Sequence, residues 1–180
     1  TDANDSAPTI RSGSSFTAAE NQTGIGSVSA SDPEGDSLGY SVSGSELLIS
    51  SSGVLTFASV PDFETKSSYT AMITVSDGTN STTQSVTVTI TDVNDVSPVF
   101  TSSASFSAAE NQTGVGTVTA TDADSSSLTF SVSGSELSIS SSGVLTFASA
   151  PDFETKSSYT ATVTVSDGTN STTQSVTVTI

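Results

Sequence analysis

The chain has 180 residues and a one-sided charge: 19 acidic residues against 3 basic ones, a formal net charge of −16. An acidic chain repels nucleic acid and anionic lipid surfaces, so we expect no nucleic-acid partner. With no apolar run of about 18 residues, we also expect no direct membrane insertion. The absence of cysteine and histidine excludes disulfide frameworks, thiol nucleophiles, zinc sites and catalysis by imidazole.

The sequence consists of two copies of one unit. Residue 1 aligns with residue 91, and the alignment runs to the end without a gap, with 67 of 90 positions identical. PDFETKSSYT and AAENQTG each occur twice, and TDAND at the start corresponds to TDVND in the middle. We predict two tandem domains, 1–95 and 96–180, with a linker over 91–97. Because the chain opens in mid-pattern, we expect it to be a piece of a longer array.

Each unit reads as short strands separated by turns. In the first copy, alternation of apolar and polar residues predicts seven strands, at 14–19, 25–31, 38–43, 47–50, 53–58, 68–76 and 84–91. Tyr69, Ala71, Ile73 and Val75 should face the core in the sixth of them. Seven such strands in about 90 residues predict an all-β chain of two tandem seven-stranded, immunoglobulin-like Greek-key sandwiches, placed end to end.

The direction of successive strands predicts where the acids lie. In the first unit, Glu20, Asp62, Glu64 and the linker residues Asp92, Asn94 and Asp95 fall at the end where the last strand finishes. Asp122, Asp124 and Asp167 fall at the opposite end of the second unit, where its first strand starts. We therefore expect these carboxylates to converge on the junction between the two domains.

Such a group of acids requires compensation. Two carboxylates about 4 Å apart repel by about 1 kcal/mol in water, and by several at an effective dielectric constant near 20. Shared protons are one remedy. A hard cation is the better one, because calcium takes six to eight oxygens from carboxylates, amides and carbonyls and tolerates irregular geometry. Softer metals would require histidine or cysteine.

Five motifs, in the family's order, resemble those of cadherin repeats, although the first copy has DPEGD where the second has the DAD of TDAD. TDVND-x-x-P-x-F at the repeat boundary resembles the DxNDNxPxF linker, AENxTG the early Glu-Asn motif, and PDFE the LDxE motif. TDAD resembles the DxD motif, and VTVSDG the acidic motif before a glycine turn. The Ser/Thr-rich composition is similar to that of bacterial cadherin-like repeats in large surface proteins.

The resemblance implies cadherin-type sandwiches with up to three Ca²⁺ ions at the central junction. Two ions would be held by Glu20, Asp62, Glu64, Asp95, Asp124 and the Val93 carbonyl. The third would be held by Asn94, the Val96 carbonyl, Asp122, Asp124 and Asp167. Corresponding residues at the outer ends, where the neighbouring repeats are not in the sequence, are Asn4, Asp5, Asp32, Glu34, Asp36, Asp77, Glu110, Asp152 and Glu154.

This sequence departs from the cadherin pattern at two places. The final Asn of the linker motif is Val96 here, at a position that the family uses through its carbonyl. The asparagine carbonyl that follows the DxD motif in the family has no clear counterpart in SSSLTF at 125–130, so the third ion has the weakest support.

Other interpretations of these residues remain open. Acidic loops are often only solvated surfaces, and Asp62 with Glu64 could be invoked as a catalytic pair, although no cleft is indicated. Asn21, Asn80, Asn111 and Asn170 lie in N-glycosylation triplets, which Ser/Thr-rich sequence also produces by chance.

We expect a calcium-rigidified extender segment of a long bacterial cell-surface adhesin, located outside the cell. Its partners would be neighbouring repeats of the same chain and a cell-surface protein or polysaccharide. The alternative is a module that itself adheres, by homophilic pairing or by binding polysaccharide. The chain has no tryptophan, so it cannot use the strand-swapping of adhesion cadherins that insert one. We expect no enzymatic activity, because no constellation supports one.

Overall fold

A computed structural model describes residues 3–125 and 127–180. The chain divides into two compact units, Thr1–Val93 and Asn94–Ile180. The sequence analysis drew the boundary after Asp95, whereas Asn94 and Asp95 form hydrogen bonds within the second unit. Strands connected by turns and loops make up the described residues, and no helix occurs among them.

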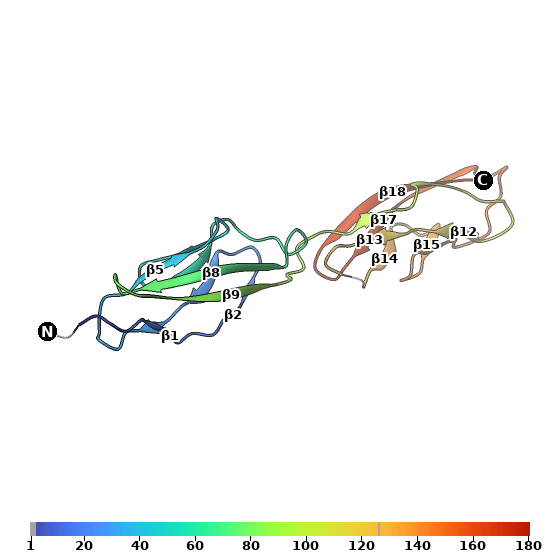
Figure 1. Ribbon diagram of the computed structural model, residues 1–180. Helices are drawn as coiled ribbons and strands as arrows, with labels where there is room; N and C mark the ends of the chain where they lie inside the picture. The colour runs from blue at the N-terminus through green and yellow to red at the C-terminus, as the bar shows by residue number, and fades with distance from the viewer. Residues whose placement is uncertain (1–2, 126) are drawn as a thin grey trace. The chain divides into compact units, whose positions relative to one another are not determined.

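Each unit contains a four-stranded sheet, a three-stranded sheet and a short two-stranded pair (Figure 1). In the first unit the large sheet has the order β2-β9-β8-β5, with β2 parallel to β9 and the other neighbours antiparallel. The small sheet has the order β3-β7-β6, and β1 pairs with β4. The strands are β1 (Thr9–Ile10), β2 (Ser15–Ala19), β3 (Gly24–Ser27), β4 (Ala30–Ser31), β5 (Gly39–Val42), β6 (Leu47–Ile49), β7 (Val54–Phe57), β8 (Ser68–Ser76) and β9 (Ser81–Thr91).

The second unit repeats this arrangement. Its sheets have the orders β11-β18-β17-β14 and β12-β16-β15, with β10 paired to β13. The strands are β10 (Val99–Phe100), β11 (Ser105–Ser107), β12 (Gly114–Thr117), β13 (Ala120–Thr121), β14 (Thr129–Val132), β15 (Leu137–Ile139), β16 (Val144–Phe147), β17 (Ser158–Ser166) and β18 (Ser171–Thr179).

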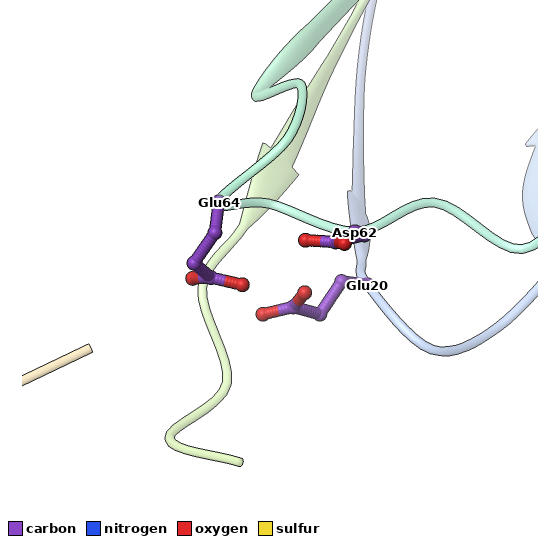
Figure 2. A group of neighbouring side chains, drawn as sticks. All are labelled: Glu20, Asp62 and Glu64. Atoms are coloured by element: carbon purple, nitrogen blue, oxygen red, sulfur yellow. The ribbon is translucent and has the colours of Figure 1, made fainter. Parts of the chain in front are cut away.

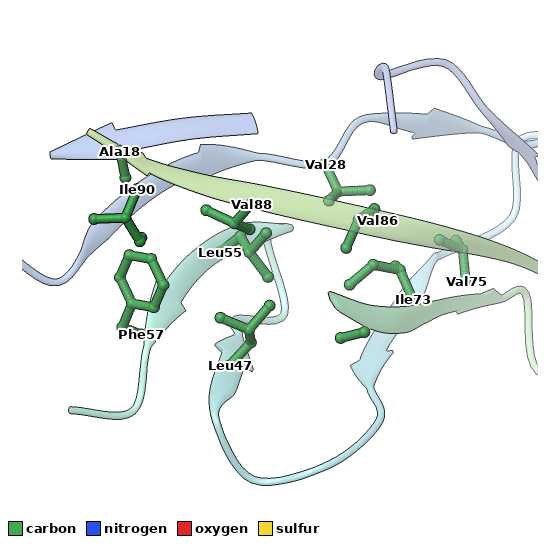
Figure 3. Close-up of a cluster of buried hydrophobic side chains, with 11 residues drawn as sticks. Ala18, Val28, Leu47, Leu55, Phe57, Ile73, Val75, Val86, Val88 and Ile90 are labelled. Carbon is green, nitrogen blue, oxygen red and sulfur yellow. The ribbon is translucent and has the colours of Figure 1, made fainter. Parts of the chain in front are cut away.

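A single apolar cluster fills the space between the two sheets of the first unit (Figure 3). Ile73 and Val75 of β8 and Val88 of β9 are fully buried, and so is Leu55 from the opposite sheet. Met72, directly before Ile73 on β8, is 43% exposed. The alternation that predicted an all-β sandwich is therefore confirmed, because successive residues of a strand point to opposite faces.

The seven-strand plan holds, but its first two strands are each divided. The first strand begins as β1, which pairs with β4, passes through residues 11–14 and continues as β2 alongside β9 in the four-stranded sheet. The second strand is likewise interrupted between β3 and β4. The sequence analysis missed β1 and the first residues of β9, because a strand of only two residues (Thr9–Ile10) and the polar run STT carry no clear alternation.

Candidate metal centre

Three carboxylates lie together at the end of the first unit where β9 finishes, which we call its C-terminal pole (Figure 2). Glu20 follows β2, while Asp62 and Glu64 lie in the loop after β7. One carboxylate oxygen from each lies within 4.8 Å of the others. The Asn21 amide donates to the Pro61 carbonyl at 3.1 Å, so a backbone hydrogen bond joins the two loops that supply these acids.

Glu20 is the buried member of this group, at 4% exposure. Its Oε2 accepts a hydrogen bond from the Phe63 amide at 2.8 Å, and its Oε1 accepts one from the Val93 amide at 2.8 Å. One carboxylate therefore fixes both the acidic loop and the first residues of the linker. Val93 itself is 41% exposed.

Asp62 accepts two hydrogen bonds from Thr65. The Thr65 hydroxyl donates to Oδ2 at 2.8 Å and the Thr65 amide to Oδ1 at 3.2 Å. These bonds hold the pKa of Asp62 below its usual range, despite an opposing contribution from burial. Asp152 in the second unit has a lowered pKa chiefly through the side-chain hydrogen bond from Thr155.

The C-terminal pole of the second unit brings together Glu110, Asp152 and Glu154 in the same way. Here Glu110 accepts the Phe153 amide at 3.2 Å but is not buried as Glu20 is. Among the described residues, the Glu110 carboxylate has no counterpart of the hydrogen bond that Glu20 accepts from the Val93 amide.

Two further acids occupy the opposite end of the second unit, its N-terminal pole. Asp122 Oδ1 accepts the amides of Asp124 at 2.9 Å and Ser125 at 2.8 Å. Asp124 Oδ2 accepts the amides of Asp95 at 2.8 Å and Val96 at 2.6 Å. The second oxygen of each carboxylate, Asp122 Oδ2 and Asp124 Oδ1, is shielded from solvent and has no hydrogen bond in the described structure.

The first unit has the same feature at its own N-terminal pole. Asp32 Oδ1 accepts the Glu34 amide at 2.9 Å, while Asp32 Oδ2 and Glu34 Oε2 are shielded and have no hydrogen bond within the described residues. Asp36 joins them, with one oxygen of each within 4.8 Å. Because the pattern occurs in both units, it is a property of the loop between the second and third strands.

The turn between the last two strands supplies one more acid to each N-terminal pole. Asp167 Oδ1 accepts the amides of Thr169 and Asn170, both at 2.6 Å. Burial alone would raise the pKa of Asp167, but these hydrogen bonds outweigh it and leave the pKa below its usual range. Asp77 in the first unit behaves in the same way. At that pole, the Ser6 hydroxyl contacts Asp5 Oδ1 at 3.4 Å and Glu34 Oε1 at 2.7 Å.

The structure adds residues that sequence analysis did not assign to the site. Asn170 donates its side-chain amide to Asn94 Oδ1 at 2.9 Å and to the Val96 carbonyl at 3.3 Å. Asn80 makes the equivalent contacts to Asn4 Oδ1 and the Ser6 carbonyl. The sequence analysis noted both asparagines only as glycosylation triplets, and their recurrence after the SDG turn was the available signal.

The donor set fits a hard divalent cation. Carboxylate, amide and carbonyl oxygens are the ligands that calcium prefers. The shielded oxygens of Asp122 and Asp124 are hydrogen-bond acceptors that only a donor or a cation could satisfy, and leaving such oxygens unpaired is costly. Asn94, Asp95, Val96, Asp122, Asp124 and Asp167 all lie in the second unit, and Glu20, Asp62, Glu64 and Val93 in the first.

Comparison with known proteins places both units in one family and one fold. The model of the bacterial Ig domain matches residues 4–91 and again 94–180. No curated protein matches the sequence. None of the described residues forms a helix that is long and apolar enough to span a membrane.

Among solved structures, the chain is similar to cadherin ectodomain fragments. Drosophila N-cadherin EC1-4 has a TM-score of 0.81 and 22% identity, over 97% of this chain and 49% of that one. Mouse cadherin-23 EC22-24 has a TM-score of 0.81 and 26% identity, over 99% and 66%. Human protocadherin-24 EC1-2 has a TM-score of 0.80 and 21% identity, over 97% of both chains. The chain spans about half the length of the Drosophila fragment.

Proposed function

The chain belongs to the bacterial Ig domain family, of which it contains two tandem copies, and from this premise we propose that it is a calcium-stiffened spacer segment of an extracellular adhesion protein. Tandem repeats of this cadherin-like kind are typical of such proteins. The proposal goes further in assigning a ligand, calcium, and a mechanical role to these particular repeats.

The observation that carries the proposal is the pair of shielded, unpaired carboxylate oxygens on Asp122 and Asp124. A polar surface loop would ordinarily expose such atoms to water. Here backbone amides fix one oxygen of each carboxylate and leave the other turned toward a place where a cation could bind. The same feature on Asp32 and Glu34 supports the proposal independently.

The position of the linker supports a mechanical role. Val93 is bound to the acidic C-terminal pole of the first unit through Glu20. Asp95 and Val96 are bound to the acidic N-terminal pole of the second unit through Asp124. Only Asn94 separates Val93 from Asp95 in the sequence, so each acidic pole is attached to one half of a very short connector.

This attachment gives calcium a means of changing stiffness. Bound Ca²⁺ would neutralise the carboxylates and be coordinated by their oxygens. In its absence, each pole joined to the connector carries uncompensated negative charge, and like charges repel. We expect the metal-free connector to flex and the calcium-bound connector to be rigid, with up to three ions involved.

Two of the tyrosines are covered by lysines, which favours a spacer over a sugar-binding platform at those rings. Lys156 Nζ lies 4.5 Å from the centroid of the Tyr159 ring and pairs with Glu136, so it covers one face of that ring. Lys66 covers Tyr69 in the same way at 4.4 Å. Stacking of a sugar on those faces would first have to displace the lysine.

Calcium titration of the 180-residue chain tests the proposal. Extracellular modules bind calcium with a Kd of about 10⁻⁴ to 10⁻³ M, so the melting temperature should rise over millimolar calcium by linkage. Small-angle scattering should show a narrower range of conformations with calcium than with chelator. Superimposable scattering profiles and equal melting temperatures would refute the proposal. Glu46→Ala removes an acid outside both poles and serves as the control, because it should leave the response to calcium unchanged.

A further inference from the structure

Asn170 holds the start of the second unit in place through its side-chain amide. Nδ2 lies 2.9 Å from Asn94 Oδ1, 3.3 Å from the Asn94 carbonyl, 3.3 Å from the Val96 carbonyl and 3.3 Å from Asp167 Oδ2. One amide group thus faces four oxygens that belong to three residues. Two of those residues lie 74 and 76 positions earlier in the sequence.

The contact is duplicated, which indicates that it is built into the fold. In the first unit, Asn80 Nδ2 lies 3.1 Å from Asn4 Oδ1, 3.3 Å from the Ser6 carbonyl and 3.4 Å from Asp77 Oδ2. The partner residues differ in identity at one place, Ser6 against Val96, but that residue contributes only its carbonyl. The interaction therefore depends on the asparagine and not on the side chain of its backbone partner.

Asn170 is itself rigidly held. Its backbone N–H donates to Asp167 Oδ1, and its backbone carbonyl accepts hydrogen bonds from the Asp167 amide at 3.2 Å and the Ser166 hydroxyl at 3.0 Å. Gly168 has a φ of +100°, which allows this tight turn to close. The next residue, Ser171, begins β18. Because the backbone of Asn170 is held in this way, its side chain can bind residues 94–96 without much further loss of entropy.

The chemistry of the amide suits a place where oxygens gather. An amide has two N–H hydrogens and no charge, so it attracts the oxygens without neutralising them, as a lysine would. A carbonyl oxygen has two lone pairs, and it can accept one hydrogen bond and still coordinate a cation. Asn170 can therefore bring the oxygens of residues 94, 96 and 167 together before any metal binds.

We propose that Asn170 is a positioning residue that fixes residues 94–96 on the N-terminal pole of the second unit in the metal-free protein and thereby preassembles the oxygens for a cation. Asn80 has the same role for residues 4–6. The statement on metal binding rests on the proposed function, whereas the statement on the metal-free protein does not.

The test compares Asn170→Ala with the matched variant Asn80→Ala in the 180-residue chain. With chelator present, hydrogen exchange of the Asp95 and Val96 amides should become roughly three- to tenfold faster in Asn170→Ala, the factor expected for one lost hydrogen bond. In Asn80→Ala it should not change. Exchange of the core amides of Val163 and Val176 should be unaltered in both variants. If the substitution merely destabilised the whole unit, exchange of these core amides would accelerate as well.

A second variant and a second measurement keep the result decisive. Asn170→Asp has the same shape but no side-chain N–H donor, and it should accelerate exchange at least as much as Asn170→Ala. Calcium titration of Asn170→Ala should give a Kd weaker by a similar factor. Unchanged exchange at Asp95 and Val96, or acceleration equal to that of the core, would overturn the proposal. Faster exchange with unaltered calcium affinity would overturn its metal-binding part. If the unmodified chain binds no calcium, the proposed function fails and the exchange data still decide the role of Asn170.

Discussion

Replacing Glu20 with glutamine should destabilise the first unit strongly, although the two side chains have nearly the same shape. The Glu20 carboxylate is 4% exposed and accepts two backbone amides, from Phe63 and Val93. A glutamine has only one acceptor oxygen, so its NH₂ group would face one of these N–H donors. Hydrogen bonds to charged groups contribute about 1.5 to 3 kcal/mol each.

We expect Glu20→Gln to lower the free energy of unfolding by about 2 to 3 kcal/mol, because one charge-assisted hydrogen bond is lost and the other becomes neutral. For a unit of about 90 residues, this corresponds to a fall in melting temperature of roughly 10 to 20 °C. The assay is thermal unfolding of the full chain in chelator, with hydrogen exchange to assign the transition to a unit.

The matched control is Glu110→Gln in the second unit. Glu110 is more exposed, and the hydrogen bond that it accepts from the Phe153 amide is longer, at 3.2 Å. We expect a loss below about 1 kcal/mol there. Equal losses in the two variants would refute the argument that burial and the Val93 contact make Glu20 special.

Two other predictions concern the stability of the fold at low pH and the backbone of a turn. Thr65→Val removes the hydroxyl that lowers the pKa of Asp62. A lowered pKa stabilises the fold above the unfolded pKa of about 3.8, and this stabilisation disappears as pH falls through the folded pKa. The melting temperatures of the variant and the parent should therefore differ at pH 6 and converge near pH 2. A difference that stays constant down to pH 2 would contradict this. Gly53 has a φ of +81° and an added Cβ would lie 2.2 Å from the Val28 carbonyl oxygen, so Gly53→Ala should cost more than the roughly 1 to 2 kcal/mol of left-handed strain alone. Gly44→Ala, at φ +80° with open space around its Cβ position, should cost only that strain, and equal melting temperatures for the two variants would show the clash to be relieved.

The C-terminal pole of the first unit and the N-terminal pole of the second differ in how their carboxylates are hydrogen-bonded. At the C-terminal pole, backbone amides occupy both oxygens of Glu20. At the N-terminal pole, Asp122 and Asp124 each keep one shielded oxygen without a hydrogen bond in the described structure. An unpaired oxygen out of contact with water is the more expensive arrangement. We therefore expect the N-terminal pole to gain more stability from a cation per carboxylate.

Several features of this protein followed from the sequence by itself. The two copies align without a gap, and the alternation over β8 and β9 is strong enough to define both strands and their buried faces. The direction of successive strands also predicted that Glu20, Asp62 and Glu64 would lie together, and the structure brings them within 4.8 Å. These inferences succeed because they depend on local periodicity and on counting strands.

Other features were decided only by the tertiary structure. Three of these features depend on segments far apart in the sequence. They are the burial of Glu20, the shielding of the Asp122 and Asp124 oxygens, and the contacts of Asn170 with residues 94–96. The division of the first strand between two sheets is of the same kind. No periodicity encodes such contacts, because they depend on how loops from different strands fold over one another. An asparagine in an NST triplet is the same in sequence whether it faces solvent or four oxygens.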